Sequence, residues 1–246
     1  MKIQLCIPFY GDLSYRTVMS VMNANDWAKS NGHHIETIFF STSATPYCFN
    51  NLLNQAIHSN SDYFVLLHSD MGTNVSNWLD VLSSDMQVEN LAVISAVAAI
   101  KSDQGITSVA VDTSDVFPRR LTLKEIHNGP PVLTNEKCKR IYGKALLINT
   151  GMMVWDMKVM RPIAHEMPFE FKDCFALENT PDGIVQRPQF IPEDWLMSKR
   201  LDERGIAYGA TRNVPTIHKG SYEFDSAKVW GEDVDSQWIM RKQLAT

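Results

Sequence analysis

Short apolar runs and amphipathic stretches alternate along the first hundred residues. The apolar runs cover residues 3–7, 35–40, 63–67 and 91–99. Runs of this length that end at proline or at polar residues are typical of strands. The run 63–67 has no polar alternation, as in a strand buried on both faces of a parallel sheet. The pattern therefore predicts four strands before residue 100.

The segments between these runs have helical spacing. Helices are predicted at residues 15–29, 49–57 and 76–86. In the first of them Val18 and Met22 lie four positions apart, as on the inner face of a helix. Asn74 or Ser76 is the expected cap of the third. Strands that alternate with helices predict an α/β fold with a doubly wound, mostly parallel, Rossmann-like sheet.

The second half of the chain is less regular. Polar residues dominate 102–135, strands are expected at 145–149 and 152–155, a long functional surface loop at 169–192, and a helix at 193–204. Gly205 follows that helix as its C-terminal cap. Because no linker is visible, we expect one domain over residues 1–246, with a regular half at 1–100 and an irregular half at 101–246.

Sheets of this class bind ligands in a crevice beyond the carboxyl ends of their strands. The segments that leave those ends are residues 8–11, 41–43 and 68–71, and all three are polar or turn-forming. Residues 8–10, which include Tyr10, and residues 41–43 are therefore expected to line one pocket.

Composition narrows the class of partner. The net charge of −5 gives no general attraction to a phosphate backbone, so a nucleic acid would need a local basic patch. The four cysteines form no CxxC pair, which favours reduced thiols in a cytoplasmic protein, with Cys6 buried in a strand. The longest apolar run is about half of what crosses a bilayer. We expect no signal peptide and no membrane partner.

Three constellations carry candidate chemistry. Asp70 follows a buried strand and points toward the crevice, where with diphosphate oxygens it suits Mg²⁺ or Mn²⁺, although it could also cap a turn. Glu193 and Asp194 open a helix, where acids favour the dipole, yet Asp194 could also accept a proton from a hydroxyl. His218 ends a short apolar strand and is either a packed residue or a ligand.

The order and spacing of these motifs resemble the GT-A glycosyltransferases, in particular the family-2-like and phage-encoded members. The matching segments are residues 7–10, 50–56, 66–71, 149–153, 193–201 closed by Gly205, and 218–220. They cover nearly the whole chain. The resemblance implies a GT-A domain whose first half binds a nucleoside-diphosphate sugar and whose second half binds the acceptor, with a divalent cation between them.

The resemblance also implies roles for single residues. Asp70 and His218 would hold Mn²⁺ or Mg²⁺, and Asp194 beside Glu193 would be catalytic. The acceptor segment would include Thr150, Gly151 and Trp195, and the donor contacts would be Pro8, Tyr10, Ser41, Asn50, His68, Ser69 and Lys219. Two positions depart from the family pattern: His68 replaces the first acid of the DxD motif, and Phe49 replaces an arginine, for which Lys219 could substitute.

Other interpretations remain open. The phage-type members that this chain resembles include enzymes that glycosylate hydroxymethylated pyrimidines in DNA. A basic cluster could grip such a DNA backbone: Arg119, Arg120, Lys124, Lys137, Lys139 and Arg140. A non-catalytic sugar- or nucleotide-binding module could use as stacking platforms Trp27, Trp78, Trp155, Trp195, Trp230 and Trp238. A sugar nucleotidyltransferase would need a glycine-rich loop after the first strand, where Gly11 stands alone.

Overall fold

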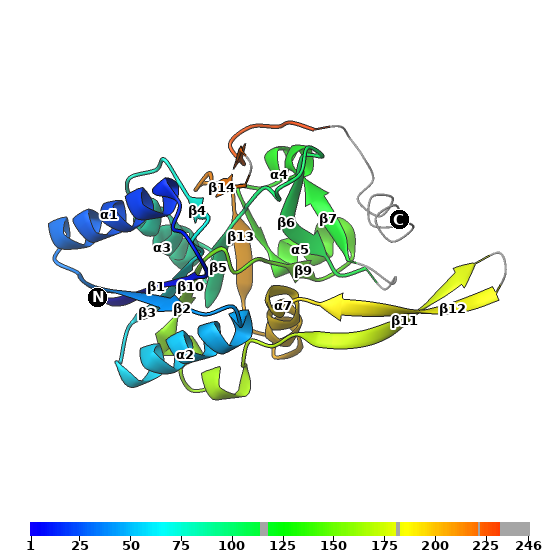
Figure 1. The fold of residues 1–246 in the computed structure, drawn as a ribbon, viewed down its shortest axis with the longest axis horizontal. Coiled ribbons are helices and arrows are strands. Elements are labelled where there is room, and N and C mark those ends of the chain that lie inside the picture. The colour runs from blue at the N-terminus through cyan, green and yellow to red at the C-terminus, as the bar shows by residue number, and fades with distance from the viewer. Residues whose placement is uncertain (114–117, 181–182, 221, 232–246) are drawn as a thin grey trace.

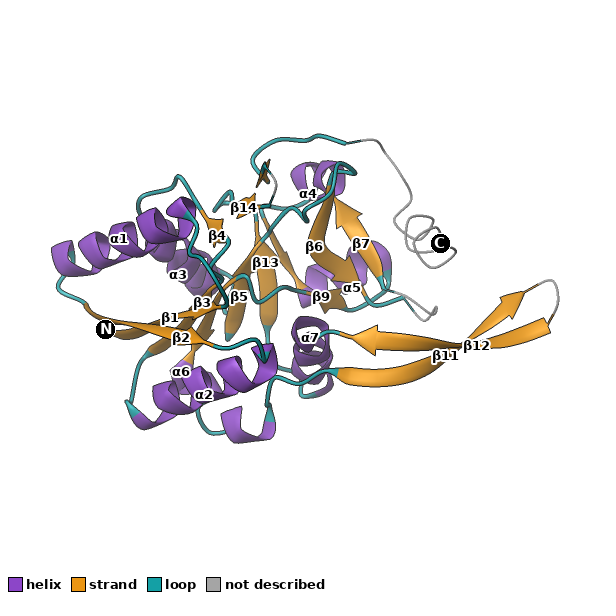
Figure 2. Ribbon diagram, in the orientation of Figure 1, coloured by secondary structure: helices purple, strands orange, loops and turns teal. Residues whose placement is uncertain are grey.

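The computed structural model describes residues 1–113, 118–180, 183–220 and 222–231, and the backbone alone for 174–180 and 186–189. The fold is mixed α/β around one large sheet (Figures 1 and 2). Its strand order is β2-β1-β3-β10-β5-β13-β8. The bounds are β1 Lys2–Phe9, β2 His34–Ser41, β3 Tyr63–Leu67, β5 Val93–Ala96, β8 Val132–Thr134, β10 Met152–Asp156 and β13 Tyr208–Thr211.

The central sheet is mostly parallel. Strands β2, β1, β3, β5 and β13 run in one direction, whereas β10 and β8 are antiparallel to their neighbours. Strand β10 from the second half of the chain lies between β3 and β5 of the first half. The four strands predicted before residue 100 are all present in this sheet.

Each face of the sheet has its own apolar core, because successive side chains of a strand point to opposite faces. Ile3, Leu5 and Ile7 of β1 pack on one side, and Cys6 packs on the other. Helices α1 (Tyr15–Ser30) and α3 (Trp78–Val88) cover the first face, and α2 (Thr45–His58) covers the second (Figure 1). Cys6 is fully buried, as its strand position predicted.

The buried face of α1 differs from the prediction. Val18 and Met22 are 40% and 53% exposed, and the helix instead buries Thr17, Ser20, Ala24 and Ala28. These small side chains let the helix approach its neighbours closely. The carbonyl oxygen of Ser20 accepts a hydrogen bond from Nε1 of Trp78 at 2.9 Å. The spacing of Val18 and Met22 therefore predicted the wrong inner face, because the close contact between α1 and α3 requires small side chains there.

The helix caps also differ in one place. Asn77, without a side-chain hydrogen bond, occupies the cap position of α3, so neither Asn74 nor Ser76 caps it. Asn74 instead accepts a hydrogen bond from Nη1 of Arg16 at 2.8 Å. The left-handed Gly205 follows α7 (Glu193–Glu203), with φ at +65°.

The second half is more regular than predicted. Its elements beyond the central sheet are β6 Ile106–Val111, β7 Arg119–Thr122, α4 Leu123–Asn128, α5 Asn135–Tyr142, β9 Leu146–Leu147, α6 Met157–Met160 and the 3₁₀ helix η1 Ala164–Glu166. Strands β7, β6 and β9 form an antiparallel sheet. Thr122 and Glu125 build a capping box at α4, and Thr134 caps α5. The T-x-x-E signal of Thr122 and Glu125 is visible in the sequence, inside the segment 102–135, which is rich in polar residues.

The predicted surface loop at 169–192 is instead a long hairpin of β11 (Lys172–Thr180) and β12 (Gly183–Ile191). It projects from the body as a two-stranded ribbon (Figure 2). Gly183 begins β12 with φ at +124°. Hairpin pairing needs no apolar period of its own, so the absence of periodicity did not exclude strands.

A small three-stranded sheet joins distant parts of the chain. Its order is β15-β14-β4, with β4 Met71–Gly72, β14 Ile217–Lys219 and β15 Glu223–Asp225. In the described part of the chain, no helix combines the length and the apolar character that a membrane crossing requires.

Candidate functional site

A cavity of about 310 Å³ opens at the carboxyl ends of β1, β2 and β3. Its walls include five of the predicted donor or metal residues: Pro8, Tyr10, His68, Ser69 and Asp70. Thr42 and Ser43 line it after β2, but Ser41, the last residue of that strand, does not. The ring of Tyr10 is 77% exposed at this cavity.

The small sheet brings Asp70 and His218 together. His218 pairs with Met71 across β14 and β4, and the backbone N–H of Lys219 donates to the Asp70 carbonyl oxygen at 2.7 Å. The His218 Nε2 atom lies 3.4 Å from Asp70 Oδ2. Strand pairing thus places the carboxylate of Asp70, which lines the cavity, beside an imidazole that lies far from it in the sequence.

The segment after β5 fixes both side chains. His218 Nδ1 lies 2.9 Å from the carbonyl oxygen of Ala99, which orients the ring so that Nε2 faces Asp70. Two residues later, the ammonium of Lys101 forms an ion pair with Asp70 Oδ2. Burial alone would raise the pKa of the Asp70 carboxyl, but hydrogen bonds from His218 and Lys101 outweigh it and hold that pKa well below its usual range.

This pair meets the geometric requirements of a metal site with few protein ligands. Two ligand atoms, each about 2.1 Å from one ion and at right angles to each other, lie about 3 Å apart, close to the observed 3.4 Å between Asp70 and His218. A carboxylate with an imidazole suits Mn²⁺ better than Mg²⁺, which prefers oxygen alone. No group of three or more His, Cys, Asp or Glu side chains in metal-binding arrangement occurs among the described residues. Among the described residues, therefore, Asp70 and His218 are the candidate protein ligands, and a bound ligand or water could complete the coordination.

His68 links this pocket to the predicted acceptor segment. Its Nε2 lies 3.3 Å from Thr150 Oγ1, and its backbone N–H donates to the Gly151 carbonyl oxygen at 2.8 Å. Burial lowers the pKa of His68 to about 4, so the ring is neutral at pH 7. A Cβ at Gly151 would lie 2.2 Å from Met71 Sδ, so any larger residue there would force the Met71 side chain to move.

The two acids at the start of α7 have raised pKa values. Burial raises the pKa of Asp194 to about 7; Glu193 adds to the rise, whereas Arg120 and the Trp195 N–H oppose it. The backbone N–H of Trp195 donates to Asp194 Oδ1 at 2.7 Å. Burial also raises the pKa of Glu193. A half-buried carboxyl group that titrates near neutrality can exchange a proton at physiological pH.

Helix α7 is attached to the acceptor segment through Ser198. The hydroxyl of Ser198 accepts a hydrogen bond from the Ile148 N–H at 3.0 Å and donates to the Asp194 carbonyl oxygen at 2.8 Å. Asp194 therefore lies one helical turn before Ser198, which binds Ile148, and the chain leads from Ile148 to Thr150 beside His68. No hydrogen bond or ion pair between Asp194 and either Asp70 or His218 is found in the described part of the chain.

Two predicted contact residues have structural surroundings. The Asn50 side chain donates to the Phe169 carbonyl oxygen and accepts from the Phe169 N–H, both at 2.8 Å, so it ties α2 to the start of the hairpin and does not line the cavity. Trp195 is 5% exposed, and the Arg120 guanidinium carbon lies 4.7 Å from its ring centroid. Trp195 thus offers little open ring surface. Of the other tryptophans, Trp78 and Trp155 are fully buried, and Trp238 lies outside the described residues.

Sequence reasoning missed Lys101, and it assigned Arg120 to a basic surface cluster. The signal for Lys101 was available, because the rule on carboxyl strand ends applies to the apolar run 91–99 as it does to the other three. No local pattern indicated that Arg120 would cover Trp195 and face Asp194.

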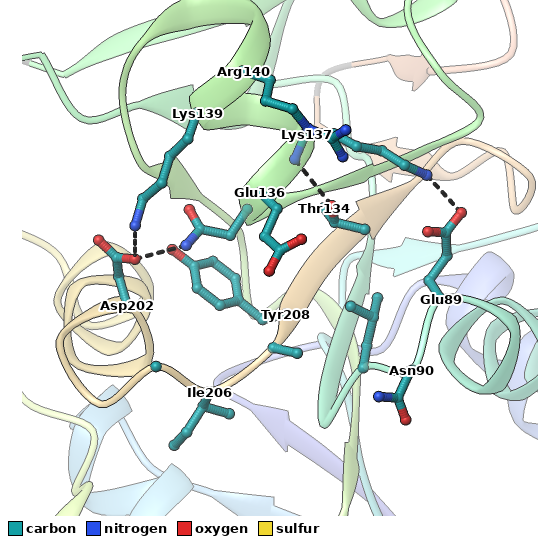
Figure 3. Close-up of a pocket in the computed structure, with 14 residues that line it drawn as sticks. Glu89, Asn90, Thr134, Glu136, Lys137, Lys139, Arg140, Asp202, Ile206 and Tyr208 are labelled. Carbon is teal, nitrogen blue, oxygen red and sulfur yellow. Dashed lines mark hydrogen bonds and ion pairs between the residues drawn. The ribbon is translucent and has the colours of Figure 1, made fainter.

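A larger cavity of about 380 Å³ lies at the opposite edge of the sheet, by the amino ends of β5 and β13 (Figure 3). Its charged side chains are largely paired across it: Lys137 Nζ lies 2.6 Å from Glu89 Oε1, and Lys139 contacts Asp202. Lys137, Lys139 and Arg140 of the basic cluster line it, but none of the predicted donor, acceptor, catalytic or metal residues does. The smaller cavity beside Asp70 is therefore the candidate site.

Comparisons with known proteins identify a similar fold and no family. No protein-family model matches the chain, and no curated protein matches it in sequence. The solved structure of A197 from STIV superposes with a TM-score of 0.55 at 12% identity, covering 96% of each chain. At that identity the likeness shows a shared fold and says nothing of activity.

Two further solved structures superpose less well. One is a glycosyltransferase involved in glycosylation of the major capsid of PBCV-1 (TM-score 0.37, 11% identity, 67% of this chain and 64% of that chain). The other is CMP:2-keto-3-deoxy-manno-octonic acid synthetase complexed with CTP (TM-score 0.40, 13% identity, 100% and 98%). Both scores are below 0.5, so neither likeness defines the fold or function of this chain.

Proposed function

We propose that this chain is a metal-dependent glycosyltransferase of the GT-A type, which moves a sugar from a nucleoside-diphosphate sugar to a hydroxyl acceptor. The observation that carries the proposal is the meeting of Asp70 and His218, 3.4 Å apart, beside a cavity formed by three carboxyl strand ends. A nucleotide fits the usual place of ligands in such sheets, and a divalent cation fits the pair.

In this proposal Asp70 and His218 hold Mn²⁺, which supplies charge neutralisation for the departing nucleoside diphosphate. Ser69 and Tyr10 line the donor cavity. Neutral His68 can donate or accept a hydrogen bond without adding charge, and its contact with Thr150 joins the donor side to the acceptor side.

Asp194 is the proposed general base. Its pKa of about 7 leaves a substantial fraction ionised at neutral pH and makes the carboxylate a better proton acceptor than an ordinary aspartate. Arg120 faces it from β7 and stabilises the ionised form. An attacking acceptor hydroxyl would transfer its proton to Asp194 as the bond from oxygen to the sugar carbon forms and the bond to the diphosphate breaks.

The direct test is a screen of nucleotide sugars for hydrolysis or transfer, with Mn²⁺ and with EDTA. We expect one donor class to turn over with Mn²⁺, and we expect EDTA to lower the rate by several orders of magnitude, since a Lewis-acid metal is worth several kcal/mol of barrier. Readdition of Mn²⁺ should restore the rate. Binding of a nucleotide sugar without turnover under any condition would instead identify a binding module.

Replacing Tyr10 by alanine should weaken donor binding about 5- to 150-fold, since stacking of an aromatic ring on a base is worth about 1–3 kcal/mol. The ring is exposed at the mouth of the cavity and has room for a base above it. Calorimetric titration with the donor found in the screen measures the effect. Tyr15→Ala is the matched control, because Tyr15 is 69% exposed and does not line the cavity. Equal affinities for the two variants would remove Tyr10 from the site.

The structure gives no support to a DNA acceptor. Within the basic cluster, Arg119 pairs with Glu125 at 2.8 Å, and Lys137 and Lys139 pair with Glu89 and Asp202. Arg120 covers Trp195. Four of the six cations are thus already engaged within the chain, which favours a small or glycan hydroxyl acceptor over a phosphate backbone.

A further inference from the structure

Lys101 forms an ion pair with the Asp70 carboxylate, on which the proposed metal site depends. Its ammonium contacts Asp70 Oδ2, the same oxygen that faces His218 Nε2. Lys101 reaches this position from the segment after β5 by passing over Gly220, where a Cβ would come within 3.2 Å of Lys101 Cδ. The lysine stem thus lies in close contact with the backbone that follows β14, and a side chain at residue 220 would crowd it.

The charge of Asp70 is thus neutralised from within the chain. The Lys101 and Asp70 side chains are 39% and 37% exposed, so the pair is not locked in the interior. A divalent ion that approaches Asp70 meets an ammonium in its path. One carboxylate and one imidazole cannot overcome that repulsion as a cluster of several acids could, and the described residues supply no third acid, histidine or cysteine.

A diphosphate changes this balance. It brings at least two negative charges to the cavity beside Asp70, and the four-carbon stem of lysine can swing its ammonium from the carboxylate to a phosphate oxygen. Asp70 Oδ2 then becomes free for the metal. The segment is suited to this exchange, because the carbonyl oxygen of Ala99 holds His218 in place whether or not Lys101 moves.

We propose that Lys101 is an internal counter-cation that excludes free divalent ions from Asp70 until a diphosphate binds, so that metal and donor enter the site together. This inference rests on the proposed function, since it assumes that Asp70 and His218 are metal ligands. Binding of metal and diphosphate is then strongly synergistic, and by linkage each raises the affinity for the other by the same factor.

The test is Mn²⁺ binding to the full chain without nucleotide, measured by electron paramagnetic resonance of free Mn²⁺. Lys101→Met keeps the length of the stem and removes the charge. We expect it to bind Mn²⁺ about 10-fold more tightly than the wild type, the factor by which a single positive charge about 5 Å away weakens binding of a doubly charged ion in water. Lys101→Arg should behave like the wild type.

Lys29→Met is the control for net charge, because Lys29 is exposed in the last turn of α1, far from Asp70 in the sequence, and forms no part of the cavity. It should leave Mn²⁺ binding unchanged. In a second arm, inorganic pyrophosphate is added, with the Mn²⁺–pyrophosphate equilibrium in solution measured separately. The synergy between the two ligands should be about 10-fold smaller in Lys101→Met than in the wild type.

The outcomes separate this inference from the proposed function. If Lys101→Met binds Mn²⁺ no more tightly than the wild type while Asp70→Ala abolishes binding with pyrophosphate, the metal site stands and the role of Lys101 is rejected. If the double variant Asp70→Ala/Lys101→Met still binds as tightly as Lys101→Met, the ion is not at Asp70, and the proposed metal site fails with the inference. A gain in Lys101→Met that Asp70→Ala removes supports both.

Discussion

Asp70→Ala is expected to abolish metal-dependent donor binding, with donor affinity falling roughly 10²-fold or more in the presence of Mn²⁺. Alanine removes the carboxylate oxygen that faces His218 and Lys101. The remaining imidazole is a single protein ligand, and one ligand cannot hold Mn²⁺ against water. Calorimetry with and without EDTA would show that the variant binds donor equally in both conditions.

The fold should survive this change. The contacts of the Asp70 side chain are partly exposed, and exposed ion pairs contribute about 0–1 kcal/mol to stability. The backbone bond from Lys219 to the Asp70 carbonyl oxygen does not depend on the side chain. Glu223→Ala is the matched control, because it removes a carboxylate paired with Arg16 at 2.9 Å on the neighbouring β15. Donor binding by Asp70→Ala as strong as by Glu223→Ala would reject the metal site.

Asp194→Asn is expected to lower turnover by about 10²- to 10⁴-fold at nearly unchanged donor affinity, if the reaction inverts the anomeric centre. The amide keeps the shape of the side chain and can still accept the hydrogen bond from the Trp195 N–H. It cannot accept a proton. Turnover that survives the substitution would reject Asp194 as the base and favour a retaining mechanism.

The pH dependence has a definite sign. A general base must be ionised, so the wild-type rate should rise with pH and level off above the pKa of Asp194, about 7. That rise should be absent from the residual activity of Asp194→Asn. A pH profile therefore distinguishes a base from a residue that only supports the helix.

Stability should change in the opposite direction from activity. The raised pKa means that the folded protein disfavours the ionised carboxylate, so stability is full below the unfolded pKa of about 4 and is lost as pH rises toward 7. Asp194→Asn removes that loss. Thermal unfolding should show the variant more stable than the wild type at pH 8 and equal to it near pH 4. An equal difference at both pH values would mean that Asp194 does not titrate as described.

Part of this structure was predictable because apolar runs of strand length are a strong signal. The run 63–67 became β3, fully buried as its lack of alternation implied. The carboxyl-end rule then placed Tyr10, His68 and Asp70 in one cavity. The meeting of Asp70 with His218 followed from the order of motifs, whereas their roles remain predictions.

Other features depend on contacts that no local pattern shows. The inner face of α1 is set by the close approach of α3, so that Ser20 is buried and Met22 is not. The hairpin of β11 and β12 forms by pairing between its own strands. The pKa of Asp194 depends on burial and on Arg120 from a distant strand. Contacts between residues, and not the local sequence pattern, determined each of these three features.

The insertion of β10 between β3 and β5 sets an order in time. A nascent chain of one hundred residues already contains β1, β2, β3 and β5, yet the strand that separates β3 from β5 has not been synthesised. Until residues 152–156 leave the ribosome, both strands present unpaired edges, and such edges invite pairing with other chains. Strand β13 (Tyr208–Thr211), the other neighbour of β5, comes later still, so the central sheet is complete only after most of the chain, Asp194 included, has been synthesised.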